Sequence, residues 1–238
     1  KKIIVPEIKT SKGTLLVVID NLRYDQFNII EKTITKYYKK QFEVPYLSIL
    51  PTATQYARNS IFSGLMPLEM EQKNPNFWKN DTDEGGKNLY EKEFLEAQLQ
   101  RLREHLKFEY YKITNLKSGK QLADSFNTVK ENDLTVIVYN FVDMLSHAKT
   151  EMEVIKELAS DDKAYRSLTN SWFLNSPLLE IIQNKLPNII NPFPQNGALH
   201  FYFLCHPLKE ELQLLKEITT KFFKNIGYAE NSIIYENF

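Results

Sequence analysis

The sequence contains a single cysteine, Cys205, among 238 residues. One thiol excludes an internal disulfide and a zinc site built from several cysteines, and it favours a reducing, cytoplasmic setting. Thirty basic and thirty acidic residues cancel, so no net field attracts nucleic acid or an anionic membrane. The apolar runs are too short to span a bilayer, and no secretory signal pattern is present. These absences predict a soluble cytoplasmic protein that does not bind a membrane.

Glycine is also scarce, with seven residues against thirteen tyrosines and fifteen phenylalanines. This ratio predicts a dense aromatic interior with few flexible hinges. With 42% hydrophobic and 25% charged residues, the chain is long enough for one or two globular domains with a sizeable core. Because the sequence starts at Lys1 rather than at methionine, we expect it to be a piece of a longer protein.

Hydrophobic patterning predicts alternating strands and helices. Strands are expected at residues 14–20, 42–50, 108–113, 134–142, 199–205 and 232–235. Helices are expected at residues 23–39, from Thr54 to about Gly64, and at 91–106, 117–130, 150–170, 176–185 and 207–225. Residues 67–90 are polar and indicate a long surface loop, and 187–197 indicate a linker or crossover loop. The alternation predicts a three-layer α/β fold, with helices on both faces of a mostly parallel sheet.

Four polar side chains follow apolar segments in a way that suits a metal-assisted hydrolase. Asp20 ends the first expected strand, Thr54 begins a helix after another, and Asp143 and His147 follow the strand expected at 134–142. The carboxyl ends of parallel strands meet at one edge of a sheet, where ligands bind. Carboxylate and imidazole groups ligate divalent cations, and a helix N-terminus stabilises a phosphoryl group on Thr54. We therefore predict that these residues converge.

Each of these residues also has a plain structural interpretation. Asp20 is equally well explained as a cap of the next helix or turn, and Thr54 as an N-cap, with Thr52 as a competing cap. A single Asp-x-x-x-His spacing, as in Asp143 and His147, also occurs by chance.

Two further residues lie in the same helix as Thr54. Arg58 and Asn59 are candidate contacts to a substrate phosphate, Arg58 as a bidentate donor. The alternative is an exposed helical face. His200 and His206 flank the apolar residues 201–205. They are candidate ligands, but the favoured interpretation is that they are structural histidines.

Residues 10–186 resemble the alkaline phosphatase superfamily, and more closely its PglZ branch, in the form found in PorX-type response regulators of type IX secretion. The segments that carry the resemblance are Val-Val-Ile-Asp-Asn-Leu-Arg-Tyr-Asp-Gln (17–26), Ile-Leu-Pro-Thr-Ala-Thr-Gln-Tyr-Ala-Arg-Asn-Ser-Ile-Phe-Ser-Gly-Leu-Met-Pro (49–67), Glu-Gly-Gly-Lys-Asn-Leu (84–89), Val-Tyr-Asn-Phe-Val-Asp-Met-Leu-Ser-His-Ala (138–148) and Ala-Tyr-Arg-Ser-Leu-Thr (164–169).

The resemblance implies a zinc-dependent phosphodiesterase or phosphatase with two zinc ions at the carboxyl edge of the sheet. It implies that Asp20 and Thr54 bind one zinc, which activates Thr54 as the nucleophile, and that Asp143 and His147 bind the other. The implied reaction passes through a covalent phosphothreonine. The resemblance also implies a response-regulator output domain, with a receiver domain upstream of this chain.

The sequence departs from this family in its second half, because it contains no Asp-His pair and the family's Asp-His-Gly ligand motif is absent. The ligand set is therefore incomplete beside the three or four ligands of functional zinc sites. Two functions remain open: a zinc-dependent phosphoric-ester hydrolase acting on nucleotide-like substrates, or a catalytically inactive effector domain that binds a protein partner or ligand.

The resemblance also divides the chain. Residues 1–186 form the expected PglZ-like α/β region, and residues 187–238 are an unassigned α/β segment that either stands apart or completes the same domain. Expected partners are a phosphorylated small molecule or an oligonucleotide substrate, and a second copy of the chain in a homodimer.

Overall fold

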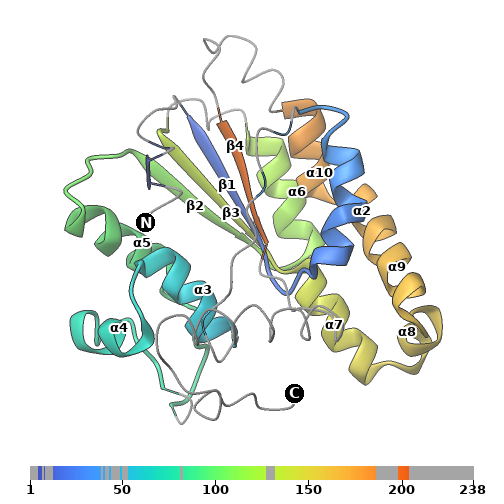
Figure 1. Cartoon of the computed structure of the whole chain (residues 1–238), viewed down its shortest axis with the longest axis horizontal. Coiled ribbons are helices and arrows are strands. Elements are labelled where there is room, and N and C mark those ends of the chain that lie inside the picture. Colours follow the sequence, from blue (N-terminus) through green and yellow to red (C-terminus); the bar gives the residue numbers. More distant parts are fainter. Residues whose placement is uncertain are drawn as a thin grey trace, which may run out of the picture.

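The computed structural model describes residues 5, 6, 8, 13–38, 40, 43, 49, 53–80, 83–126, 132–185 and 198–203. In this part of the chain the strands β1 (Thr14–Ile19), β2 (Phe108–Ile113), β3 (Leu134–Tyr139) and β4 (Ala198–Phe203) form a sheet in the order β2-β3-β1-β4. Every pair is parallel, and β1 lies at the centre between β3 and β4. The strands converge toward their carboxyl ends (Figure 1).

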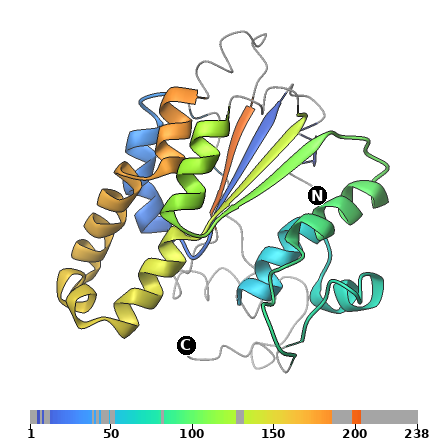
Figure 2. The ribbon, with the colours of Figure 1, turned by 180° about the vertical axis from the view of Figure 1, so that it is seen from behind.

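Helices cover both faces of this sheet. They are α2 (Tyr24–Ile34), α3 (Thr54–Ser63), α4 (Pro67–Lys73), α5 (Glu91–Arg101), α6 (Leu116–Ser125), α7 (Phe141–Glu151), α8 (Glu153–Leu158), α9 (Asp162–Leu174), α10 (Pro177–Glu180) and the π-helical turn η2 (Ile181–Lys185). Both views show α3, α4 and α5 on one side of the sheet, and α2, α6, α9 and α10 on the other (Figures 1 and 2).

The alternation of side chains along β1 explains these layers. All six of its residues are buried, because successive side chains point to opposite faces and both faces are covered. Val17 and Ile19 pack into a cluster with residues of α2, α6, α9 and α10. Leu16 and Val18 pack into a second cluster with residues of α3, α4 and α5. The predicted three-layer α/β fold with a parallel sheet is therefore confirmed.

Several boundaries differ from the prediction. The loop predicted at 67–90 contains α4, which begins with Pro67 and whose only buried residue is Met70. The helix predicted at 150–170 is divided into α8 and α9, and α7 before it begins directly after β3. The helix predicted at 23–39 ends at Ile34. Most of the strand predicted at 42–50 lies outside the described residues, as do 187–197, the helix at 207–225, the strand at 232–235 and His206.

Within the described residues, no helix is both long and apolar enough to cross a membrane.

Candidate functional site

Asp20 lies at the carboxyl end of the central strand. Its backbone N–H donates to the Tyr139 carbonyl at the end of β3, 3.1 Å away, and Asn21 then turns the chain with a φ of 57°. The residue is only 3% exposed. Burial raises the pKa of Asp20 to about 6; the Arg58 guanidinium lowers it, and the carboxylate of Asp143 raises it further. Asp20 therefore lies at the carboxyl end of β1, and its role as a metal ligand stays a prediction.

Arg58 reaches Asp20 from the second turn of α3. Its Nη1 lies 2.6 Å from Asp20 Oδ2 and 3.3 Å from Asn140 Oδ1, and its Nε donates to Glu91 Oε1. The residue is 1% exposed, so these acceptors, rather than water, stabilise its positive charge. The alternative of an exposed helical face is therefore wrong for Arg58, and its role as a phosphate contact stays a prediction.

Asn59, the next residue of α3, is buried as well. Its Nδ2 donates to the Lys87 carbonyl at 3.2 Å, and its Oδ1 has no hydrogen-bond partner among the described residues. Asn59 thus ties α3 to the segment before α5. The exposed-face alternative is wrong here too, and a contact from Asn59 to substrate stays a prediction.

Glu91 is the member of this site that sequence reasoning missed. It is the first residue of α5 and 1% exposed. Besides Arg58, it accepts hydrogen bonds from Tyr110 Oη at 2.6 Å and from Lys112 Nζ at 3.0 Å. Burial and the Glu91 carboxylate raise the pKa of Tyr110, so the phenol stays protonated and donates. An acidic residue at a helix start is typical of surface capping, so the sequence carries no signal for this buried role.

Thr54 is the first residue of α3 and is partly buried. The N-cap of α3 is Ala53, which has no capping side chain, so the alternative that Thr54 is the N-cap is wrong. The first turn contains no acidic residue. The N-terminus of a helix carries partial positive charge, and Thr54 lies at this end of α3. Its role as a nucleophile stays a prediction.

Asp143 and His147 lie one turn apart on α7. His147 Nε2 is 3.7 Å from Asp143 Oδ1. The side chain of His147 is 68% exposed and that of Asp143 is 28% exposed. Asp143 lies in the first turn of α7 and interacts electrostatically with Asp20. The sheet thus brings Asp20, Asp143 and Arg58 of α3 to one edge, with α3 and α7 on its two sides (Figures 1 and 2).

The predicted ligands fit a pair of zinc ions only in part. Donors of one tetrahedral zinc, each about 2.0–2.2 Å from the metal, are separated by roughly 3.5 Å. His147 Nε2 and Asp143 Oδ1 are 3.7 Å apart, close to this value, so the pair supplies two of the donors that one ion needs. Asp20 does not fit, because its carboxylate is already paired with a buried guanidinium. In the described part of the chain, no group of three or more His, Cys, Asp or Glu side chains is placed to hold a metal ion.

The sequence profile of a family described as the BREX system PglZ alkaline phosphatase-like domain matches residues 1–190. No curated protein matches the chain.

Proposed function

Because the chain belongs to the PglZ family of alkaline phosphatase-like domains, we propose that it is a phosphoric-ester hydrolase whose nucleophile is the Thr54 hydroxyl. The observation that carries the proposal is the convergence of Asp20, Arg58 and Asp143 at the carboxyl edge of the sheet. Arg58 follows Thr54 by one helical turn, so its ion pair with Asp20 anchors the helix that carries the nucleophile.

In the proposed reaction the Thr54 oxygen bonds to phosphorus and the bond to the ester oxygen breaks. The hydroxyl proton leaves with the departing alcohol, and a phosphothreonine remains. Water then hydrolyses this intermediate, giving the free threonine and either phosphate, from a monoester, or a phosphomonoester, from a diester. The positive end of the α3 dipole stabilises the negative charge on the phosphoryl oxygens.

Zinc belongs to the same proposal, with Asp143 and His147 as the residues that would hold an ion. Bound there, it would polarise a phosphoryl oxygen of the substrate. Substrates of this chemistry are phosphorylated small molecules, nucleotides or oligonucleotides. A cytoplasmic role as output domain of a two-component response regulator, with homodimerisation, is a further part of the proposal, supported by the resemblance of residues 10–186.

A second candidate function is an inactive effector domain that binds a protein partner or ligand. Two observations favour it: the buried ion pair between Asp20 and Arg58, and the absence of a three-donor metal group from the described residues. On this view the chain keeps the fold of a phosphoesterase but does not catalyse hydrolysis.

The test compares the wild-type chain with Thr54→Ala on p-nitrophenyl phosphate, bis(p-nitrophenyl) phosphate and a short oligonucleotide, with zinc present. Loss of the nucleophile should reduce hydrolysis at least about 100-fold. Thr35→Ala is the matched control, because Thr35 is exposed at the far end of α2. Mass spectrometry of the acid-quenched protein should find a phosphoryl group on Thr54. Equal hydrolysis by wild type and Thr54→Ala would refute the nucleophile, and no hydrolysis by the wild type would favour the effector function.

A further inference from the structure

Asp20 already has a cation beside it that belongs to the chain. The Arg58 guanidinium lies 2.6 Å from Asp20 Oδ2, and the side chains of Arg58 and Asp20 are 1% and 5% exposed. A guanidinium this close offsets part of the cost of burying the carboxylate. A divalent cation on the same carboxylate would stand within a few ångströms of the guanidinium, and like charges in a buried site repel strongly.

Arg58 is also fixed in place by three acceptor residues that are far from it in the sequence. Its Nε is bound by Glu91 of α5, and its Nη1 is shared between Asp20 and Asn140. Glu91 is fixed in turn by Tyr110 and Lys112 of β2. Moving Arg58 aside to admit a metal ion would leave Glu91 without one of its two cationic partners in the interior, which is costly.

The other pair of donors has the opposite character. Asp143 and His147 are partly and largely exposed, and their donor atoms lie 3.7 Å apart. Among the described residues, His147 is the one ion-pair partner of Asp143. This pair is therefore accessible to an ion from solvent, whereas Asp20 is enclosed.

We propose that Arg58 takes the place of a metal ion at Asp20, so that this edge of the sheet binds one zinc ion, at Asp143 and His147. The identity of the metal rests on the proposed function, whereas the exclusion of metal from Asp20 rests on the geometry of Arg58 alone. Asp20 is then a positioning residue that holds α3 against the end of β1.

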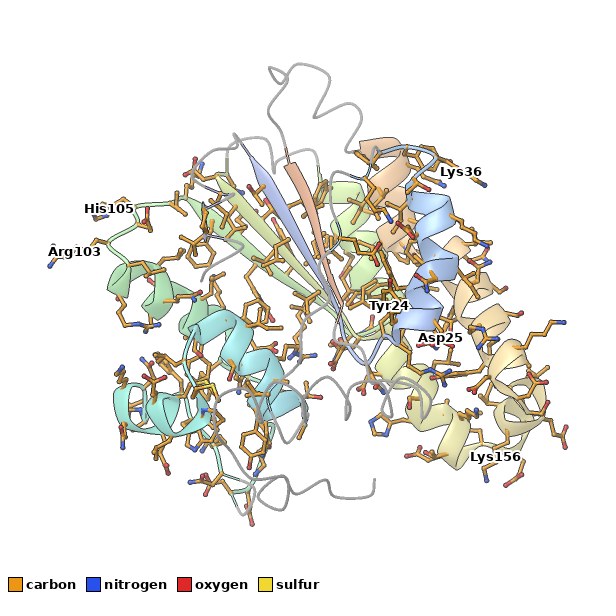
Figure 3. All side chains as sticks on the ribbon, in the orientation of Figure 1. Tyr24, Asp25, Lys36, Arg103, His105 and Lys156 are labelled. Carbon is orange, nitrogen blue, oxygen red and sulfur yellow. The ribbon has the colours of Figure 1, made fainter. Side chains whose placement is uncertain are left out.

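The experiment counts zinc directly. The metal-stripped full chain is titrated with zinc alone by isothermal calorimetry, and bound zinc is measured by elemental analysis after dialysis. We expect one equivalent. Asp143→Asn and His147→Gln should weaken binding at least about tenfold, whereas Asp20→Asn should leave the zinc ion bound. His105→Gln is the control for loss of an exposed histidine, because His105 lies beyond the end of α5, away from this edge (Figure 3).

Two equivalents in the wild type, no bound zinc, or loss of zinc in folded Asp20→Asn would each overturn the proposal. Circular dichroism tests whether Asp20→Asn folds. If it does not fold, the zinc stoichiometry of the wild type still tests the proposal. The zinc count is separate from the hydrolysis assay. One equivalent without hydrolysis leaves this inference standing and refutes the proposed function, and hydrolysis with two equivalents does the reverse.

Discussion

The environment of Asp20 predicts an unusual pH dependence of stability. Its pKa rises from 3.8 to about 6 in the folded chain, chiefly through burial. Between these two values the folded state keeps the proton while the unfolded state has lost it. The folded state therefore binds more protons, and the free energy of unfolding falls as pH rises through this window. Below pH 3.8 the penalty is absent, and above about pH 6 it is complete.

The size of the effect follows from the same two values. A change from 3.8 to about 6 corresponds to roughly 3 kcal/mol in full, of which roughly 2.5 kcal/mol develops between pH 4 and pH 7. Asp20→Asn keeps the shape of the side chain and removes the titration. The free energy of unfolding of the wild type, relative to Asp20→Asn, should therefore decrease by about this amount from pH 4 to pH 7.

Urea denaturation with a metal chelator, repeated at half-unit steps of pH, measures the difference between the two proteins. Asp25→Asn is a control with the opposite sign. Although burial raises it, hydrogen bonds from Arg23 and Arg166 leave the pKa of Asp25 lowered, so its contribution to stability is lost as pH falls. Asp25 lies at the start of α2, on the helical layer opposite α3 (Figure 3). Parallel pH profiles for wild type and Asp20→Asn would refute the buried environment assigned to Asp20.

Three further substitutions test the fold around this edge. Arg58→Met should lower the free energy of unfolding by about 3–5 kcal/mol, because Asp20 and Glu91 lose their shared buried cation; a loss under about 1 kcal/mol in urea denaturation would contradict the network. Gly64→Ala should cost about 1–2 kcal/mol in thermal unfolding, because Gly64 ends α3 with a φ of 62°; Gly86→Ala is the comparison at an exposed glycine without a positive φ. Asp161→Ala should cost about 1 kcal/mol, because Asp161 caps α9 through a 2.7 Å hydrogen bond, and Asp161→Asn should restore most of it.

The sheet could be predicted because its strands are short and buried on both faces. β1 and β3 are unbroken runs of buried residues, so the apolar pattern predicts each strand to within a few residues. Where the apolar run continues beyond the strand, the predicted end of the strand is wrong. Phe141 and Val142 extend the run of β3 but belong to α7, because an apolar run of this length carries no period that separates strand from helix. The sequence does not predict α4, because this helix buries only Met70 and so lacks an amphipathic pattern.

The sequence predicts only those parts of the site that depend on a residue's position at the end of a strand or the start of a helix. Asp20, Thr54 and Asp143 each follow a recognisable strand or begin a helix, and the structure places them accordingly. The burial of Arg58 and the role of Glu91 depend on a contact between residues 33 positions apart in sequence. No local pattern encodes that contact, because it arises only when α3 and α5 pack together on the sheet.

The carboxylates of Asp20 and Asp143 lie in different environments and have different proposed roles. Activity measurements on mutants would not distinguish these roles. Asp20 is enclosed and holds α3 through Arg58, so its loss should displace Thr54 and reduce turnover even if it never touches a metal or substrate. Asp143 is partly exposed beside His147 and is free to meet a ligand. Both substitutions should therefore depress hydrolysis, but only Asp143→Asn should release zinc. Activity alone would class both as metal ligands, and the zinc count is what distinguishes a positioning carboxylate from a coordinating one.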